Sequence, residues 1–354
     1  MSAAQGAGAA PATTAAAASG AGGIGSAAQS LLTVDRLEVA YPGRGFRAKP
    51  ARILKGVSIE IGAGRTLGLV GESGSGKTTL GRALLGLAPV TGGRITFDGR
   101  DATHASRSER KRLSRDMQVV FQDPYTSLNP AMEVGAILAE PLVVQGIGGT
   151  EAKKRIAELL DQVGLPSDSI HRLPREFSGG QRQRVAIARA LALRPKLIVC
   201  DEPVSALDLS TQARVLDLFL AIQQETGVSY LFISHDLDVV RHISHEVSVL
   251  FRGDIVEHGP AEQVTRDPQH PYTKRLLLAS PVPDPDRQAM RRRERRELID
   301  AEAAADGTAA EAGPGGAADA ADAASAGHGP HGSTTTTAAS ARPGGSERSD
   351  ALRG

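Results

Sequence analysis

A glycine-rich stretch that follows a short apolar run has the composition of a phosphate-binding loop. Residues 66–70 read TLGLV and residues 71–79 read GESGSGKTT. Glycines let the backbone curl until successive N–H groups point inward, Lys77 adds a cation, and Thr78 offers a hydroxyl to Mg²⁺. A chance Gly/Ser-rich linker is the alternative, but a strand-like run precedes the loop and a helical pattern follows it. We therefore expect the phosphates of a nucleoside triphosphate to bind Gly71, Glu72, Ser73, Gly74, Ser75, Gly76, Lys77, Thr78 and Thr79.

Two carboxylates stand at the end of a second apolar run. Residues 197–200 read LIVC, as expected for a strand buried on both faces, and Asp201 and Glu202 follow directly. In parallel α/β sheets the ligand crevice lies at the carboxyl ends of the strands. Asp201 therefore suits a Mg²⁺ ligand, directly or through water, and Glu202 suits a group that polarises an attacking water molecule. An ordinary acidic turn would be preferred if the chain had no phosphate loop.

A second predicted anion site lies at residues 177–181, which read FSGGQ. Ser178 is expected to cap a helix over residues 182–191, with glycines that expose the first N–H groups, although a plain capped helix is the alternative. One ATP cannot easily reach two helix N-termini on distant parts of one chain, so we expect two copies of the domain to enclose the nucleotide. Each nucleotide would then contact the phosphate loop of one copy and Ser178, Gly179, Gly180 and Gln181 of the other.

These three patterns, in this order, resemble the ATP-binding cassette (ABC) ATPases over about residues 32–280. Phe177 departs from the family pattern, where Leu is more usual, and the exchange of one apolar residue for another puts little in doubt. The resemblance implies ATP and Mg²⁺ as cofactors, ATP hydrolysis, and nucleotides enclosed between paired domains. It implies catalytic roles for Glu202, His235 and Gln122, metal contacts for Thr78, Gln122 and Asp201, and nucleotide contacts for Tyr41 and Asp208.

Several of these residues also have a structural alternative. The resemblance makes Tyr41 the aromatic that stacks on adenine, and a buried strand tyrosine is its alternative. Asp208 belongs to a loop expected at the dimer interface, and a helix cap is its alternative. His235 is expected to sense the γ-phosphate, whereas a lone histidine is more often structural. Asp236 is expected to orient the His235 ring, and the resemblance also implies interface contacts for it. Gln122 has no meaning by itself and is expected to touch Mg²⁺ and the attacking water only because of the resemblance.

The expected fold class is α/β, with a P-loop NTPase (RecA-like) core, an antiparallel β subdomain and an inserted α-helical subdomain. Residues 32–39 and 53–61 alternate in polarity as antiparallel strands do. Apolar residues at helical spacing, such as Ile156, Leu159 and Leu160, indicate the helical subdomain. The predicted divisions are a disordered Ala/Gly-rich tail (1–29), an ABC ATPase domain (30–265) whose helical subdomain spans about 123–180, a C-terminal extension (266–300) and a disordered tail (301–354).

Composition limits the classes of partner. The 354 residues carry 41 Lys plus Arg against 40 Asp plus Glu, so no overall positive field favours nucleic acid. The only cysteine, Cys200, permits neither an intrachain disulfide nor a cysteine-ligated cluster, and it is interpreted as a small core residue. We expect neither a membrane-spanning run nor a signal peptide. The basic run at residues 287–296 is expected to be a solvated helix face, and contact with anionic lipid or nucleic acid is the alternative.

Stretches outside the cassette core resemble the ATPases of oligopeptide/dipeptide importers. They are HPYTKRLLLAS at residues 270–280, PVPDP at residues 281–285, and the segment at residues 121–130. The likeness is to the ATPase without a C-terminal Cys cluster, and Ala131 departs from it where a basic residue is common. The implied partners are a second ABC ATPase subunit (a paralogue or the chain itself), two transmembrane permease subunits and an extracytoplasmic substrate-binding protein, with no nucleic acid.

The resemblance implies an energy-coupling ATPase for peptide import, held at the cytoplasmic face of the cell membrane by its permeases. Related nickel and glutathione importers share the same stretches, so nickel and glutathione stay open as alternative cargoes. A non-transport ATPase acting on nucleic acid or ribosomes usually carries tandem cassettes or a long coiled-coil insertion, and the FSGGQ helix argues against a simple phosphate-loop kinase. The C-terminal stretch is expected to serve permease assembly, so truncation before His270 should leave the phosphate loop intact.

Overall fold

The computed structural model describes residues 30–43, 49–123, 127–279 and 290. Both predicted tails, residues 280–285 and, apart from Met290, the basic run lie outside the described residues. The strands are β1 (Ser30–Tyr41), β2 (Ala51–Gly62), β3 (Thr66–Val70), β4 (Val90–Phe97), β5 (Arg100–Asp101), β6 (Met117–Val120), β7 (Leu197–Asp201), β8 (Ser229–Ser234), β9 (Glu246–Phe251) and β10 (Asp254–Pro260). The helices are α1 (Lys77–Leu84), α2 (Arg107–Asp116), α4 (Val134–Val144), α5 (Gly149–Gln162), α6 (Gly179–Leu191), α7 (Leu209–Thr226), α8 (Leu237–Ile243), α9 (Ala261–Arg266) and α10 (Pro271–Ala279), with 3₁₀ turns at Ser167–His171 (η1) and Pro174–Glu176 (η2).

Four strands form an antiparallel sheet in the order β2-β1-β4-β5. Buried and exposed residues tend to alternate along β1 and β2, because one face packs on apolar side chains and the other does not. Val34 of β1 pairs with Ile59 of β2 on one side and with Ile95 of β4 on the other, so a row of buried side chains crosses three strands. The strands expected over residues 32–39 and 53–61 are confirmed.

The second sheet has six strands in the order β10-β9-β3-β8-β7-β6. Its strands pair in parallel except for the antiparallel edge strand β10. Neighbouring residues of β7 enter different cores: Ile198 packs with the helical part of the chain, and Val199 packs with the antiparallel sheet. Because both faces are covered, β7 carries a continuous apolar run, and burial raises the pKa of the Cys200 thiol within it.

The register of the parallel strands places their carboxyl ends side by side. Val70 of β3 pairs with Ser234 of β8, and Asp201 of β7 pairs with Ile233 of β8. Val120, the last residue of β6, pairs with the residue before Asp201. The segments that follow these four strands therefore meet at one edge of the sheet, which is where parallel sheets hold their ligands.

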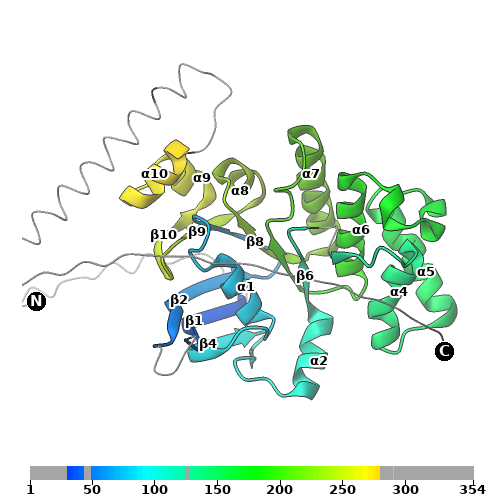
Figure 1. Cartoon of the computed structure of the whole chain (residues 1–354), viewed down its shortest axis with the longest axis horizontal. Coiled ribbons are helices and arrows are strands. Elements are labelled where there is room, and N and C mark those ends of the chain that lie inside the picture. Colours follow the sequence, from blue (N-terminus) through cyan, green and yellow to red (C-terminus); the bar gives the residue numbers. More distant parts are fainter. Residues whose placement is uncertain (1–29, 44–48, 124–126, 280–289, 291–354) are drawn as a thin grey trace, which may run out of the picture. The chain divides into compact units, whose positions relative to one another are not determined.

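Helices α4, α5 and α6 gather in one region of Figure 1, beyond β6 and α7. The apolar face of α5 buries Ile156, Leu159 and Leu160, the residues whose spacing predicts a helix. They share a core with Leu138 of α4 and Ile187 of α6. The helical insertion is therefore confirmed, and together with the two sheets it completes the predicted α/β fold.

The C-terminal helix α10 packs near α8 and α9 (Figure 1). Its residues Tyr272 and Leu276 are buried in one cluster with Val240 of α8, Val247 of β9 and Val264 of α9. The position of α10 is therefore fixed by the core around β9. None of the helices in the described ranges combines the length and the apolar character that crossing a membrane requires.

Candidate nucleotide-binding and hydrolysis site

The phosphate-binding loop connects β3 to α1 and curls around the Lys77 side chain. Gly76 has a φ of 112°, in the left-handed region that glycine adopts at little cost. The buried Lys77 ammonium donates to the carbonyl oxygens of Gly71, at 2.7 Å, and Glu72, at 2.9 Å. Burial lowers the pKa of Lys77, and nearby carboxylates, that of Glu202 foremost, oppose the shift. The loop therefore holds its cation in a fixed place.

A cavity of about 820 Å³ opens beside this loop, within the usual size range of small-molecule sites. Backbone N–H groups, one ammonium and hydroxyls border it, and this donor set fits a polyphosphate chain. Sequence-predicted residues that line the cavity are Glu72, Ser73, Gly74, Gly76, Lys77, Thr78, Thr79, Gln122, Glu202 and His235.

The other two residues of the predicted loop, Gly71 and Ser75, lie behind this lining. A Cβ atom at Gly71 would come within 2.2 Å of the Leu250 carbonyl oxygen, so the backbone there leaves no room for a side chain. Ser75 is buried, and its carbonyl oxygen accepts from the Gly253 N–H at 3.0 Å. These two residues seat the loop on the end of β9 and on the turn after it.

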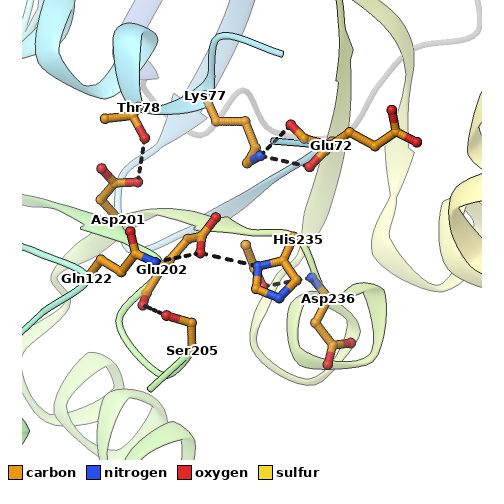
Figure 2. Close-up of polar contacts among 11 residues, drawn as sticks. Glu72, Lys77, Thr78, Gln122, Asp201, Glu202, Ser205, His235 and Asp236 are labelled. Carbon is orange, nitrogen blue, oxygen red and sulfur yellow. Dashed lines mark hydrogen bonds and ion pairs between the residues drawn. The ribbon is translucent and has the colours of Figure 1, made fainter. Parts of the chain in front are cut away.

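Thr78 in α1 and Asp201 at the end of β7, two of the three predicted metal contacts, lie together, although only Thr78 of this pair is among the described residues that line the cavity. Thr78 Oγ1 donates to Asp201 Oδ1 at 3.2 Å, as Figure 2 shows. Burial raises the pKa of Asp201, and the hydrogen bond from Thr78 acts in the opposite direction. A hydroxyl and a carboxylate are ligands that Mg²⁺ combines with phosphate oxygens and water, so these residues fit that ion.

Two side chains from neighbouring strand ends hold the Glu202 carboxylate (Figure 2). Gln122 Nε2 donates to Glu202 Oε2 at 3.2 Å, and His235 Nδ1 lies 3.2 Å from the same oxygen. The Glu202 backbone has a φ of 48°, which is uncommon for a residue other than glycine. Two hydrogen bonds of 3.0 Å stabilise this turn: Ser205 Oγ donates to the Glu202 carbonyl oxygen, and the Glu202 N–H donates to the Ile233 carbonyl oxygen. The site therefore contains a carboxylate fixed at the cavity.

Asp236 has a different role from the expected one. Its Oδ1 accepts from the backbone N–H groups of Asp238, at 2.8 Å, and Val239, at 3.4 Å, and so caps α8. The expectation that Asp236 orients the His235 ring is wrong, because the ring contacts Glu202 instead. Helix α8 begins directly after Asp236, and the Asp236 carboxylate accepts hydrogen bonds from the first turn of this helix.

None of the four residues Ser178 to Gln181 is among the described residues that line the cavity. The predicted cap is confirmed: Ser178 Oγ accepts from the Gln181 N–H at 3.3 Å, and the Ser178 N–H donates to Gln181 Oε1 at 3.0 Å. A Cβ atom at Gly180 would lie 2.4 Å from Thr211 Cγ2 of α7, whereas a Cβ atom at Gly179 would meet nothing nearer than 3.6 Å. Within this chain Gly180 serves close packing, whereas a Cβ atom at Gly179 would make only an ordinary van der Waals contact, with Leu207.

Tyr41 and Asp208 are likewise not among the described residues at the cavity. Tyr41 is partly buried at the end of β1 and packs on the core of the antiparallel sheet. Asp208 caps α7, since its Oδ1 accepts from the Ser210 hydroxyl at 2.6 Å and the Thr211 N–H at 3.0 Å. These bonds, that of Ser210 foremost, hold the pKa of Asp208 well below its usual range. Nucleotide contacts by either residue stay predictions.

The C-terminal helix supplies site residues that sequence reasoning missed. Leu276 and Ala279 of α10 line the cavity. Tyr272 Oη accepts a hydrogen bond from the backbone N–H of Glu72 at 2.8 Å. This hydrogen bond argues against the expectation that truncation before this helix leaves the phosphate loop intact, and the effect of the truncation stays a prediction. The only signal in the sequence was the tyrosine itself, because a buried tyrosine hydroxyl usually finds a polar partner.

A mainly parallel sheet with a glycine-rich loop after β3 and paired carboxylates at the end of β7 defines a phosphate-loop NTPase. Residues 54–205 match the family described as ABC transporter, and residues 256–308 match the oligopeptide/dipeptide transporter C-terminal region. Residues 54–205 of the chain therefore belong to the ABC transporter family, as the sequence motifs imply.

Curated relatives share about half of the aligned residues. The oligopeptide transport ATP-binding protein OppD of Mycobacterium tuberculosis is 52% identical over 237 residues, covering 67% of this chain and 39% of that protein. The glutathione import ATP-binding protein GsiA of Pectobacterium atrosepticum is 49% identical over 278 residues, covering 77% of this chain and 44% of that protein. The chain thus spans about two fifths of the length of the curated relatives it matches.

Solved structures share the fold. The cbiO1 protein of Clostridium perfringens, part of the ABC transporter complex cbiONQ, has a TM-score of 0.61 and 28% identity, covering 67% of this chain and 91% of that one. A dimeric post-hydrolysis structure of the ATP-binding cassette MJ0796, bound to ADP and Pi, has a TM-score of 0.58 and 28% identity. The match covers 65% of this chain and 98% of that one. These likenesses confirm the cassette fold.

Proposed function

We propose that this chain is the ATP-hydrolysing, nucleotide-binding subunit of an ABC importer for di- and oligopeptides. One observation carries the enzymatic part: the Glu202 carboxylate, held by Gln122 and His235, borders the same cavity as the phosphate loop. A phosphate loop alone serves binding, whereas a fixed carboxylate beside it adds a group that can polarise water. The match to the ABC transporter family supports this reading.

The residues of the site divide the chemistry between binding and hydrolysis. The loop N–H groups and Lys77 bind the phosphates, and Thr78 and Asp201 would hold Mg²⁺ together with Gln122. When bound, the ion would neutralise charge on the phosphate oxygens. Glu202 accepts a hydrogen bond from the attacking water and draws away its proton. His235 keeps the carboxylate in place and stands at the cavity edge, where it can contact the terminal phosphate.

The complete site is composed of two protomers in this proposal. Ser178, Gly179, Gly180, Gln181 and Asp208 do not border the cavity of their own chain, yet the α6 N-terminus presents N–H groups that suit an anion. The dimeric structure of the similar cassette MJ0796, bound to ADP and Pi, supports a two-fold arrangement. We place these residues against the nucleotide of the facing protomer, and Tyr41 against the adenine.

The remaining partners follow from the importer assignment. We propose that two such ATPases, identical or paralogous, bind two permease subunits at the cytoplasmic face of the membrane. An extracytoplasmic binding protein would deliver the cargo. The match of residues 256–308 to the C-terminal region of oligopeptide/dipeptide transporters supports this class of importer. The nearly equal counts of basic and acidic residues, 41 against 40, give no support for a nucleic-acid partner.

Glutathione is a second candidate cargo. GsiA of Pectobacterium atrosepticum, named as a glutathione importer subunit, is similar over 77% of this chain, and OppD of Mycobacterium tuberculosis over 67%. Both cargoes are peptide-like molecules, and neither name separates them for this chain. We favour di- and oligopeptides because the C-terminal match is described by that cargo.

Uptake by cells that lack this chain tests the proposal. Labelled dipeptides, oligopeptides and glutathione would be supplied to the deletion strain and to strains complemented with the original chain, Lys77→Ala or Glu202→Gln. Peptide uptake should fall on deletion and return only with the original chain. A selective fall in glutathione uptake would assign the second cargo. Unchanged uptake of all three solutes would refute the peptide importer assignment, while ATP hydrolysis by the purified protein separately tests the enzymatic part.

A further inference from the structure

One peptide unit of the phosphate loop is held at both of its ends. Its N–H, which belongs to Glu72, donates to Tyr272 Oη at 2.8 Å. Its C=O, which belongs to Gly71, accepts from Lys77 Nζ at 2.7 Å. The orientation of this peptide plane therefore depends on α10 at one end and affects the place of the Lys77 ammonium at the other.

Tyr272 is firmly seated in the structure. Its side chain is 2% exposed, and its ring lies against Phe251 with centroids 4.1 Å apart. The start of α10 is tied down as well, because the Tyr272 N–H donates to His270 Nδ1 at 3.1 Å and the His270 N–H donates to Glu257 Oε2 at 3.1 Å. A hydroxyl fixed in this way can orient a backbone group with little loss of entropy on binding.

The same helix also reaches the nucleotide cavity. Leu276, one turn after Tyr272, lines the cavity together with Ala279 at the end of α10. Leu276 is itself buried in the cluster around β9, so this part of the cavity wall is rigid. The helix thus meets the nucleotide site twice, at the loop and at the wall.

We propose that α10 is a working part of the ATP site and that Tyr272 is a positioning residue for the phosphate loop. The proposal rests on the nucleotide-binding function proposed above. By fixing the Gly71–Glu72 peptide, Tyr272 holds the start of the loop and Lys77 in the arrangement that receives phosphate. Glu202, Gln122 and His235 lie on other strand ends and do not depend on this bond, so α10 acts on nucleotide affinity and not on the chemical step.

Tyr272→Phe in the full chain removes only the hydroxyl and tests the proposal. Tyr230→Phe is the matched control, because Tyr230 is equally buried, its hydroxyl donates to the Phe219 carbonyl oxygen at 3.1 Å, and it is not among the described residues at the cavity. The measurements are the Kd for Mg·ATP by displacement of a fluorescent ATP analogue, steady-state KM and kcat, and the melting temperature of the nucleotide-free protein.

Tyr272→Phe should raise Kd and KM for ATP about fivefold with kcat nearly unchanged, a change of the size that one hydrogen bond makes. Tyr230→Phe should leave all three constants unchanged even where its melting temperature falls. Equal Kd values for Tyr272→Phe and the original chain would overturn the proposal. Failure of the original chain itself to bind ATP would instead refute the proposed function.

Hydrogen exchange gives a second readout that needs no nucleotide. Amides of residues 71–76 should exchange several-fold faster in Tyr272→Phe than in the original chain, because the Glu72 N–H loses its acceptor. Tyr230→Phe should not change exchange in this segment. Unchanged loop protection in Tyr272→Phe would contradict the positioning role even if the variant were less stable overall.

Discussion

Glu202 Oε2 lies 3.2 Å from Nδ1 of His235, and this contact joins the ends of two neighbouring strands. An ionised carboxylate only accepts hydrogen bonds, so a hydrogen bond from the ring to such a carboxylate requires the proton on Nδ1. The other ring nitrogen, Nε2, is then available for a second contact. The geometry of the site thus depends on the pairing of β7 with β8, which places Asp201 opposite Ile233.

Replacing Glu202 with Gln should retain ATP binding and abolish turnover. The amide keeps the shape of the side chain but loses the charge that polarises water, and loss of such a group commonly costs ~10²-fold or more in rate. Steady-state hydrolysis and the Kd for ATP are the measurements. Glu151→Gln, the same change on the exposed side of α5, is the control and should behave as the original chain does. Near-normal hydrolysis by Glu202→Gln would contradict the assignment.

Asp201→Asn should stabilise the nucleotide-free protein while lowering hydrolysis by ~10²-fold. Burial raises the pKa of Asp201 above its usual value of 3.8, so its ionised form is less favourable in the folded state than in the unfolded one. The free-energy cost of ionising Asp201 in the folded protein is absent below pH 3.8. It grows as the pH rises through the raised folded pKa and is constant above that pKa.

The melting temperatures of Asp201→Asn and the original chain, compared over a pH series, check this prediction. The advantage of the variant should be full near neutral pH and should shrink towards pH 3.8. Thr78 can still donate to the retained oxygen of the Asn side chain, so lost hydrogen bonding does not obscure the result. A lower melting temperature for the variant at neutral pH would contradict this prediction. It would show that the ionised Asp201 carboxylate stabilises the nucleotide-free protein.

The parts of the site that sequence motifs predict are the parts that local chemistry determines. A run of glycines followed by Lys77 requires a curled loop, and a buried strand ending in Asp201 and Glu202 requires carboxylates at a sheet edge. Ser178 is predicted to cap a helix, and the structure contains that cap as a capping box with Gln181. In each case the residues that interact are close in the sequence or end paired strands.

The residues that sequence reasoning missed depend on packing between distant segments. Tyr272 and Glu72 are 200 positions apart, and nothing in either segment specifies their contact. Their meeting follows from the burial of α10 against β9, which pairs with β3 just before the phosphate loop. Asp236 shows the converse case, since the carboxylate that was expected to orient the neighbouring His235 ring caps α8 instead.

Asp208→Asn should make the protein less stable near neutral pH and leave it nearly equal to the original chain in acid. Hydrogen bonds from Ser210 and Thr211 lower the pKa of Asp208, so its ionised form is favoured in the folded state. The resulting stability is present above the usual aspartate pKa of 3.8 and is lost as the pH falls through the lowered folded pKa. Urea unfolding across this range is the measurement. A difference between the two proteins that does not vary with pH would refute the ionised cap.

Gly179→Asp should abolish hydrolysis without lowering the melting temperature. A Cβ atom at Gly179 meets nothing nearer than 3.6 Å, and an acidic residue in the first turn of α6 favours its helix dipole. Activity would then be lost because the new charge repels the phosphates of the nucleotide bound to the facing protomer. Gly180→Ala is the contrasting variant: its Cβ atom lies 2.4 Å from Thr211 Cγ2, so its melting temperature should fall. Full activity in Gly179→Asp would exclude a nucleotide contact there.

Mixing two inactive variants should restore hydrolysis if each site is shared between protomers. In a mixed dimer of Gly179→Asp and Glu202→Gln, one site combines both defects, and the other combines the intact Glu202 of the first variant with the intact Gly179 of the second. A site built within one chain would leave every protomer defective. The measurement is the ATPase rate of the mixture against each variant alone, with light scattering of the ATP-bound mixture to establish the dimer. A mixture that forms dimers and stays as inactive as its components would contradict the two-protomer site, whereas partial recovery would place Gly179 on the nucleotide of its partner.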